Sequence, residues 1–286
     1  MRVPAFFSDY QRAAETELRR VVPDEGDIVQ RSMAYTLHAP SKRVRPVLTM
    51  LCAELCGGTA QRALPAAVAI EMVHASSLIL DDLPSMDDAP LRRGRPTNHR
   101  EFGEAIAILA AFGLLNGAFG NLARGYEPPL AARLATLLAD SIGPDGLIGG
   151  QAADLLATDG QIDFETLERI HRGKTGALFV AAATSGAITA GAPGDAIASL
   201  AAYARNLGLA FQIIDDLLDV EGDPAETGKA VRGDARKTTF VSFSGVSGAR
   251  QLARELCETA DRSLASFGRR ADRLRELSEF VAARSL

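Results

Sequence analysis

The sequence predicts an all-α fold, with residues 1–286 forming a single large helical bundle around a central cavity. Three observations lead to this prediction. Alanine and leucine dominate, apolar residues recur at spacings of three and four, and neither a set of strand-like segments nor a domain linker interrupts the chain. Hydrophobic residues make up 47% and charged residues 23% of the chain, as is ordinary for a soluble protein with a large core.

The individual helices follow from apolar stripes and from the turn residues between them. The first stripe consists of Phe6, Phe7, Tyr10, Ala14 and Leu18. The second consists of Leu48, Leu51, Cys52 and Leu55, and it ends at Gly57–Gly58. Further helices are expected at about 62–83, 101–125, 130–157, 163–190, 196–221, 237–244 and 249–284, with an interruption at Gly149–Gly150. Four of these segments, 66–83, 102–122, 165–190 and 196–220, are apolar on all sides and are predicted to lie inside the bundle.

Composition excludes several functional classes. The net charge of −5 argues against a nucleic-acid partner, and no HExxH, GxSxG, Walker or GxGxxG motif occurs in a suitable setting. The most apolar stretch, Ala105–Leu115, is shorter than the roughly 20 residues of a membrane span, so no transmembrane segment is expected. Three cysteines without a CxxC pair fit a reducing, cytoplasmic location.

Two acidic motifs follow apolar helical runs. The first contains Asp81-Asp82 and, beyond Pro84, Asp87-Asp88; the second contains Asp215-Asp216 and Asp219. An intact helix places Asp215 and Asp219 on one face, where like charges repel unless a hard divalent cation is bound between them. Because Pro84 disfavours a straight helix, the spacing does not decide whether Asp87 or Asp88 joins Asp81.

Basic residues occur close to these motifs in the sequence. They are Lys42, Arg43 and Arg45, then Arg92, Arg93 and Arg95, then Lys174 within an apolar helix, and Lys229 after the second acidic motif. Carboxylates that hold magnesium, together with arginines and lysines, suit a metal-bridged diphosphate.

Together the motifs resemble the trans-type polyprenyl diphosphate synthases. The resemblance runs in order from about Lys42 to Phe240 through KRVRP, HASSLILDDLPSMDDAPLRRGRPTNH, GGQAADL, KTGALF, FQIIDDLLD and GKAVRGDARKTTF. The first acidic block is most similar to that of bacterial geranylgeranyl diphosphate synthases. Two positions depart from the family pattern, Ser41 in place of glycine and Phe240 in place of tyrosine, and neither removes a predicted ligand.

The resemblance implies the isoprenoid synthase fold, a homodimer and a role for each motif. Three Mg²⁺ ions are implied, with Asp81 and Asp87 as ligands supported by Asp82, and with Asp215 and Asp219 opposite. Arg92, Lys174 and Lys229 would bind the allylic diphosphate (dimethylallyl, geranyl or farnesyl). Lys42, Arg45, His74 and Arg93 would hold isopentenyl diphosphate, and Lys174, Thr175 and Gln212 would flank the allylic cation.

Product length is expected to depend on Ser76 and Ser77, which lie one turn deeper than Asp81. Farnesyl-forming relatives commonly carry an aromatic residue there, so these small serines predict a C20 product, geranylgeranyl diphosphate. A C15 farnesyl product is the alternative, with Phe112 or a neighbouring subunit closing the pocket. A terpene cyclase and a non-catalytic partner subunit fit the sequence less well, because both acidic motifs and the basic residues for a second diphosphate are intact.

Overall fold

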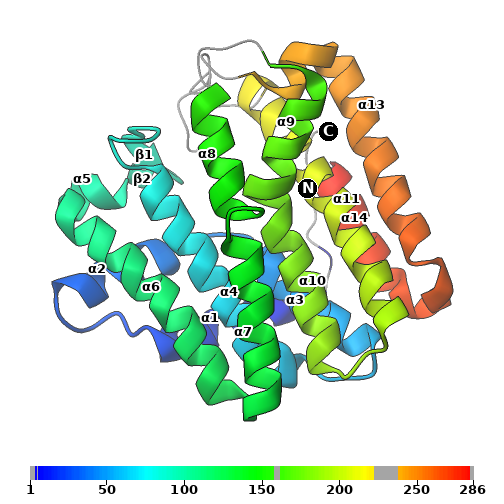
Figure 1. Ribbon diagram of the computed structural model, residues 1–286, viewed down its shortest axis with the longest axis horizontal. Coiled ribbons are helices and arrows are strands. Elements are labelled where there is room, and N and C mark those ends of the chain that lie inside the picture. Colours follow the sequence, from blue (N-terminus) through cyan, green and yellow to red (C-terminus); the bar gives the residue numbers. More distant parts are fainter. Residues whose placement is uncertain (1–3, 5, 158–161, 222–237, 284–286) are drawn as a thin grey trace.

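The computed structural model describes residues 4, 6–157, 162–221 and 238–283, and it confirms the all-α prediction (Figure 1). In chain order the elements are α1 Phe7–Val21, α2 Ile28–Leu37, α3 Val44–Leu55, α4 Ala60–Asp81, β1 Leu91–Arg92, β2 Arg95–Pro96, α5 Asn98–Phe102, α6 Glu104–Gly125, α7 Pro128–Ile142, α8 Leu147–Ala157, α9 Phe164–His171, the π-helical turn η1 Arg172–Gly176, α10 Ala177–Thr189, α11 Gly194–Glu221, α13 Phe240–Ser263, the 3₁₀ segment η2 Ala265–Ala271 and α14 Asp272–Ala282.

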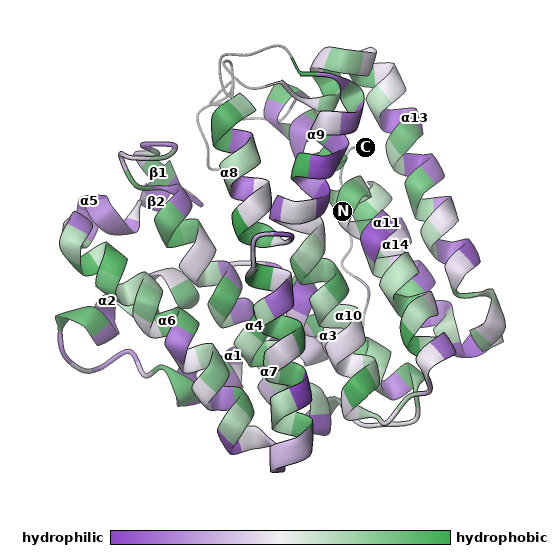
Figure 2. Ribbon diagram, in the orientation of Figure 1, coloured by the Kyte–Doolittle hydropathy of each residue, from purple (hydrophilic) through white to green (hydrophobic). Residues whose placement is uncertain are grey.

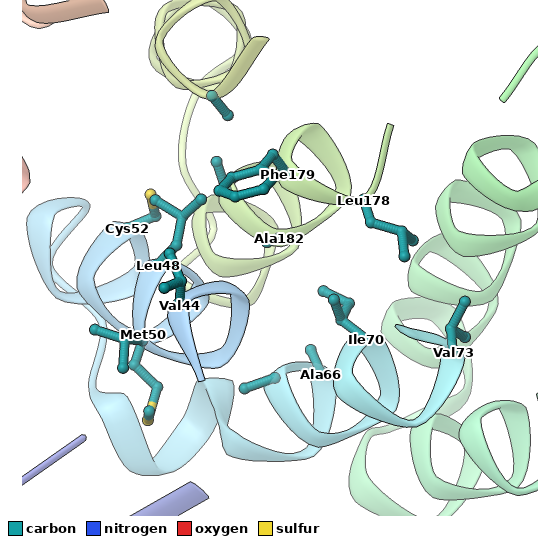
Figure 3. Packing of buried hydrophobic residues seen from close by; sticks show 14 of the residues in the cluster. Val44, Leu48, Met50, Cys52, Ala66, Ile70, Val73, Leu178, Phe179 and Ala182 are labelled. Carbon is teal, nitrogen blue, oxygen red and sulfur yellow. The ribbon is translucent and has the colours of Figure 1, made fainter. Parts of the chain in front are cut away.

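The centre of the bundle is formed by α3, α4 and α10. Their facing side chains include Leu48, Ile70 and Phe179, each almost fully buried (Figure 3). The axes approach closely because small residues lie at the contact: a Cβ on Gly186 of α10 would lie 2.1 Å from the carbonyl oxygen of Thr49 on α3. Burial of this apolar surface is the main favourable term in folding, and it fixes the two helices on which the first basic and first acidic motifs lie.

The outer helices complete the bundle around this centre. α6 packs along α4, whereas α11 packs against α10 on one side and α13 on the other. Figure 2 shows hydrophobic residues along α6 and α10 and hydrophilic residues in the β1–β2 hairpin, which lies at one end of the molecule. The C-terminal ends of α4 and α11 lie toward that same end (Figure 1), which brings both acidic motifs there.

The structure corrects several predicted boundaries. α2 was not predicted, although Asp27 and Gln30 form a capping box at its start. The predicted helix 130–157 is two helices broken at Gly143–Gly146, whereas Gly149–Gly150, the expected interruption, is helical inside α8. The predicted helix 163–190 contains η1, and 249–284 is divided by η2.

The antiparallel pair β1–β2 was also not predicted, because each strand has only two residues. Local backbone geometry explains the breaks in the C-terminal helices. Gly268 at φ 57° and Gly245 at φ 67° interrupt the C-terminal helices, since both adopt backbone conformations that a regular helix excludes.

Three helices, α4, α6 and α11, are long and apolar enough to cross a membrane by length and composition alone. The expectation drawn from Ala105–Leu115 therefore understated the apolar length of α6. The apolar window of α4 is 72% buried and that of α11 50%, but that of α6 only 39%. Packing inside the bundle accounts for the composition of α4, while α6 keeps an exposed apolar face.

Candidate active site

The first acidic motif lies where α4 ends. Beyond Asp81 the chain folds back, and the backbone N–H of Asp87 donates to the carbonyl oxygen of Asp81 at 3.0 Å. Asp88 instead adopts φ 43°, and its carboxylate accepts from Arg100 at 2.9 Å on the exposed side. The structure therefore brings the backbone of Asp87 next to that of Asp81, and it pairs the carboxylate of Asp88 with Arg100.

Asp82 is turned into the protein and is paired with an arginine of the hairpin. It is 3% exposed, and its two oxygens accept from Arg92 at 2.6 to 2.8 Å. Burial lowers the pKa of Arg92, but the hydrogen bonds and charge of Asp82, with the charge of Asp81, outweigh burial and raise it. Arg92 therefore stays charged, and Asp82 supports the site by holding this guanidinium.

A tight turn presents the neighbouring arginine to a different part of the site. Arg93 and Gly94 connect β1 to β2 with φ values of 54° and 72°, the left-handed pair typical of two-residue hairpin turns. Burial lowers the pKa of Arg93; the charge of Glu71 opposes this, and that of Arg43 adds to it. The charges that act on Arg93 therefore include Glu71 of α4 and Arg43, which precedes α3, and its assignment to isopentenyl diphosphate stays a prediction.

Arg45, in the first turn of α3, is 9% exposed, and its guanidinium lies over the ring of Phe179, 4.6 Å from the centroid. Burial lowers its pKa to about 10, despite the opposing charges of Glu71 and Asp215, so it stays charged at neutral pH. Lys42 lies over the ring of Phe280 at 5.5 Å. Arg45 is thus surrounded by protein and close to the second acidic motif.

His74 completes this basic group from α4. Burial, followed by the charges of Arg45, Arg93, Arg92 and Arg43, lowers the pKa of His74 well below its usual range. The imidazole is therefore neutral at pH 7 and can donate or accept a hydrogen bond.

Sequence reasoning missed the ion pair that supports this group. Arg43 donates to Glu71 at 2.7 Å, with both side chains almost fully buried, and it also donates to the carbonyl oxygen of Leu37 at 2.7 Å. A buried glutamate in an apolar helix was the available signal, because such a charge needs a partner.

Lys174 lies in η1, the π-helical turn between α9 and α10. Its Nζ is 2.7 Å from Oδ2 of Asp154 and 3.3 Å from Oδ1 of Asp81. Gln151 donates to the same oxygen of Asp81 at 2.6 Å. Gln151 and Asp154 belong to the quoted GGQAADL motif but were not assigned a role, and their spacing of three residues on a helix was the signal.

The next residue, Thr175, connects to the second acidic motif. Its hydroxyl donates to Oε1 of Gln212 at 2.8 Å, and Gln212 donates to Asp216 at 2.9 Å. Asp216 is 8% exposed and also accepts from the backbone N–H of Phe240 at 3.0 Å. Because α11 is continuous here, Asp215 and Asp219 lie on one face, and Asp216 faces the protein interior.

The predicted chain-length residues lie on two faces of α4. Ser76 is 3% exposed, and its hydroxyl donates to the carbonyl oxygen of Ala111 on α6 at 2.8 Å. Ser77 is partly exposed and donates to the carbonyl oxygen of His74. Phe112 is 63% exposed, so within this chain it does not close a pocket. Lys229 lies outside the described residues.

The donor set fits magnesium that is bound together with a diphosphate. Within the described ranges no three His, Cys, Asp or Glu side chains are gathered closely enough to form a ready-made metal cage. Mg²⁺ commonly takes only one or two protein carboxylates, with substrate phosphates and water as its other ligands. Asp81 and Asp87 on one side, and Asp215 and Asp219 on the other, would hold the ions in this way.

Comparison with known proteins decides the family. A sequence model of the polyprenyl synthetase family matches residues 26–264. The chain belongs to this family. It is a trans-prenyltransferase of the farnesyl or geranylgeranyl diphosphate synthase type.

Relatives of this polyprenyl synthetase divide between two product names. A farnesyl diphosphate synthase of Geobacillus stearothermophilus is 40% identical, with 99% of this chain and 98% of the relative covered. A geranylgeranyl diphosphate synthase of Cyanophora paradoxa is also 40% identical, with 98% and 96% covered. The apo crystal structure of an FPP/GFPP synthase from Zymomonas mobilis matches with a TM-score of 0.86 at 35% identity, covering 97% of each chain. This similarity confirms the isoprenoid synthase bundle.

Proposed function

We propose that this protein condenses isopentenyl diphosphate with allylic diphosphates, in a magnesium-dependent reaction, to give geranylgeranyl diphosphate. One observation carries the proposal: two consecutive residues of η1 connect the two acidic motifs. Lys174 lies 3.3 Å from Asp81, and Thr175 is bonded to Gln212, which is bonded to Asp216. A diphosphate bound here would contact Lys174 directly. The acidic motifs on either side of it would bind the cations that bridge to the diphosphate.

The chain's own residues account for the steps around the allylic substrate. When bound, Mg²⁺ would neutralise the leaving diphosphate. Arg92 and Lys174 bind and orient the allylic diphosphate, which favours ionisation of its carbon–oxygen bond because charge is stabilised where it develops. Thr175 and Gln212 place their dipoles beside the allylic cation. Phe211, whose ring centroid lies 5.3 Å from that of the buried Phe179, would add an apolar surface beside these groups and help to exclude water.

The second substrate is assigned to the basic group at the start of α3. Arg45 and Arg93 supply positive charge for the diphosphate of isopentenyl diphosphate, and Lys42 and His74 supply further hydrogen-bond donors. Isopentenyl diphosphate held in this way would present its homoallylic double bond to the allylic cation. The proton lost after carbon–carbon bond formation would pass to the departing diphosphate.

The small side chains of Ser76 and Ser77 support the C20 product. Both side chains are short, and that of Ser76 is bound to the carbonyl oxygen of Ala111 on α6, so neither would extend far into the path of a growing chain. A farnesyl product remains the alternative, since names of relatives include both products.

The exposed apolar face of α6 supports a homodimer. Ile108, Leu109 and Phe112 are 37%, 52% and 63% exposed along this helix, and exposed apolar patches on soluble proteins mark interaction surfaces. A cytoplasmic location is proposed as well, because Cys52, Cys56 and Cys257 are free thiols.

Product analysis tests the proposal directly. Purified protein, isopentenyl diphosphate carrying a radiolabel, dimethylallyl diphosphate and MgCl₂ should give a C20 product on chromatography, and EDTA should abolish it. A clean C15 end product would refute the serine argument.

The metal assignment has its own test. Asp81→Ala and Asp215→Ala should each lower turnover by at least about a hundredfold, since each removes a cation ligand and its transition-state stabilisation. Asp140→Asn, an exposed acid on α7, is the matched control and should keep normal turnover. Normal rates in both alanine variants would remove the metal assignment.

A further inference from the structure

Two side chains of α8, those of Gln151 and Asp154, contact residues of the active site but have no role in the reaction described above. Gln151 and Asp154 lie three residues apart on α8, so they occupy one helix face. Both side chains reach polar groups of the site: Gln151 contacts Asp81, and Asp154 contacts Lys174. A helix that supplies two such contacts is placed to arrange the residues that bind substrate.

A backbone contact holds α8 against the turn that carries Lys174. A Cβ added to Gly150 would lie 2.1 Å from the backbone nitrogen of Lys174 and 2.7 Å from the carbonyl carbon of Gly173. Only glycine permits this approach, so the position of Asp154 relative to the Lys174 backbone is fixed by main-chain packing.

The lysine side chain needs such support. Its four-carbon stem has many rotamers, and holding it in one of them has an entropic cost. Its Nζ lies 2.7 Å from Asp154 and 3.3 Å from Asp81, so Asp154 makes the shorter contact. The Asp154 side chain is only 13% exposed, which limits competition from water.

We propose that Asp154 is a positioning residue that keeps Lys174 directed at the diphosphate of the allylic substrate. The inference rests on the proposed function of Lys174. When Asp81 uses its oxygens as cation ligands, it no longer offers them fully to Lys174. Asp154, which lies outside both acidic motifs, then remains to hold the ammonium in place.

A double-mutant cycle with inorganic pyrophosphate as the probe tests this inference. The dissociation constant is measured by calorimetry in MgCl₂ for the unmodified protein, Asp154→Asn, Lys174→Gln and the double variant. Asp154→Asn should weaken binding about tenfold, the effect of a lost charge-assisted contact, but change it less than about twofold when Lys174 is already glutamine.

Three results would overturn the inference. Unchanged binding would show that Lys174 is held without Asp154, and equal losses in both backgrounds would show that Asp154 does not act through Lys174. Tighter binding by Asp154→Asn would show that the carboxylate competes with the substrate for Lys174.

Kinetics separate positioning from general stability. Asp154→Asn should raise KM for the allylic diphosphate about tenfold, with KM for isopentenyl diphosphate and the thermal midpoint nearly unchanged, and Asp154→Glu should recover part of the loss. Asp140→Asn controls for the change in net charge. If the unmodified protein forms no prenyl product, the proposed function is wrong, while the pyrophosphate cycle still decides whether Asp154 acts through Lys174.

Discussion

The backbone N–H of Asp87 donates to the carbonyl oxygen of Asp81 at 3.0 Å, which turns the chain back immediately after α4 ends. This bond places the backbone of Asp87 against the end of α4. Asp87 is held beside Asp81, whereas Asp88 pairs with Arg100 away from it. This geometry favours Asp87 over Asp88 as the partner of Asp81, a choice that the spacing of the motif leaves open.

We expect Asp87→Asn to lower turnover by about a hundredfold or more, because a predicted cation ligand loses its charge. Asp88→Asn is the matched control. Asparagine tolerates the left-handed conformation of residue 88, so turnover should stay within about threefold of normal. Initial rates at saturating substrate and several magnesium concentrations provide the measurement, and a larger loss at Asp88 than at Asp87 would reverse the assignment.

His74 should give the folded protein a measurable pH dependence. Its pKa in the folded state is lowered from the ordinary value of 6.5 by burial and by neighbouring arginines. Between pH 6.5 and the lower folded-state pKa, His74 takes up a proton in the unfolded chain but stays neutral in the folded chain. The contribution of neutral His74 to stability is therefore present above pH 6.5 and is lost as the pH falls toward the folded-state pKa.

Urea unfolding of the unmodified protein and of His74→Gln, at pH 7.5, 6.5 and 5.5, measures this contribution. Glutamine does not titrate, so the variant should lose less stability across the series, by up to about 1.4 kcal/mol per pH unit. At each pH, the difference in the free energy of unfolding between the two proteins removes the contribution of the other histidines, which titrate in both. Parallel curves would show that His74 titrates normally.

Ser76→Phe should shorten the product from C20 toward C15. Ser76 is buried against α6, where its hydroxyl donates to the carbonyl oxygen of Ala111, so a ring at this position would have to be accommodated beside the α4–α6 contact, below Asp81. Some loss of stability is expected from crowding. Ser76→Ala adds no bulk and should keep the C20 product. Chromatography of the prenyl products of both variants measures their chain length. An unchanged product from Ser76→Phe would show that Ser76 does not control chain length.

Gly186→Ala should destabilise the bundle by about 1–3 kcal/mol, because its Cβ would lie 2.1 Å from the carbonyl oxygen of Thr49 and force α3 and α10 apart. Gly194→Ala, at the start of α11, is the control, since no atom lies within 4 Å of its added Cβ. Chemical denaturation of both variants measures the difference. Equal stabilities would show that the α3–α10 contact readily relaxes.

The sequence was sufficient for the fold class because the long helices are extended apolar runs separated by turn residues, with no set of strand-like segments between them. The continuous run ending at Asp81 and the one containing Asp215 were both found, and each is helical as predicted. Boundaries were less predictable where single residues decide them. Gly143 and Gly149 look equivalent in the sequence, but only the segment that begins at Gly143 interrupts a helix.

The grouping of site residues depends on geometry that periodicity does not encode. A π-helical turn directs Lys174 and Thr175 toward opposite motifs, and its hydrogen-bond register cannot be recognised from RGKTG alone. The pairing of Arg43 with Glu71 joins residues 28 positions apart. The resemblance to the family supplied candidate roles, while the partners Gln151, Asp154 and Glu71 required the structure.

The hairpin that presents Arg92 and Arg93 limits the insertions and deletions that this protein can accept during evolution. Two consecutive residues are divided between two groups of charges, Arg92 with Asp82 and Arg93 near Glu71 and Arg43. A gain or loss of one residue within this short ribbon would exchange the directions of both guanidinium groups at once. We therefore expect length variation to be excluded between Leu91 and Pro96, even though the segment lies on the surface, where insertions are usually tolerated.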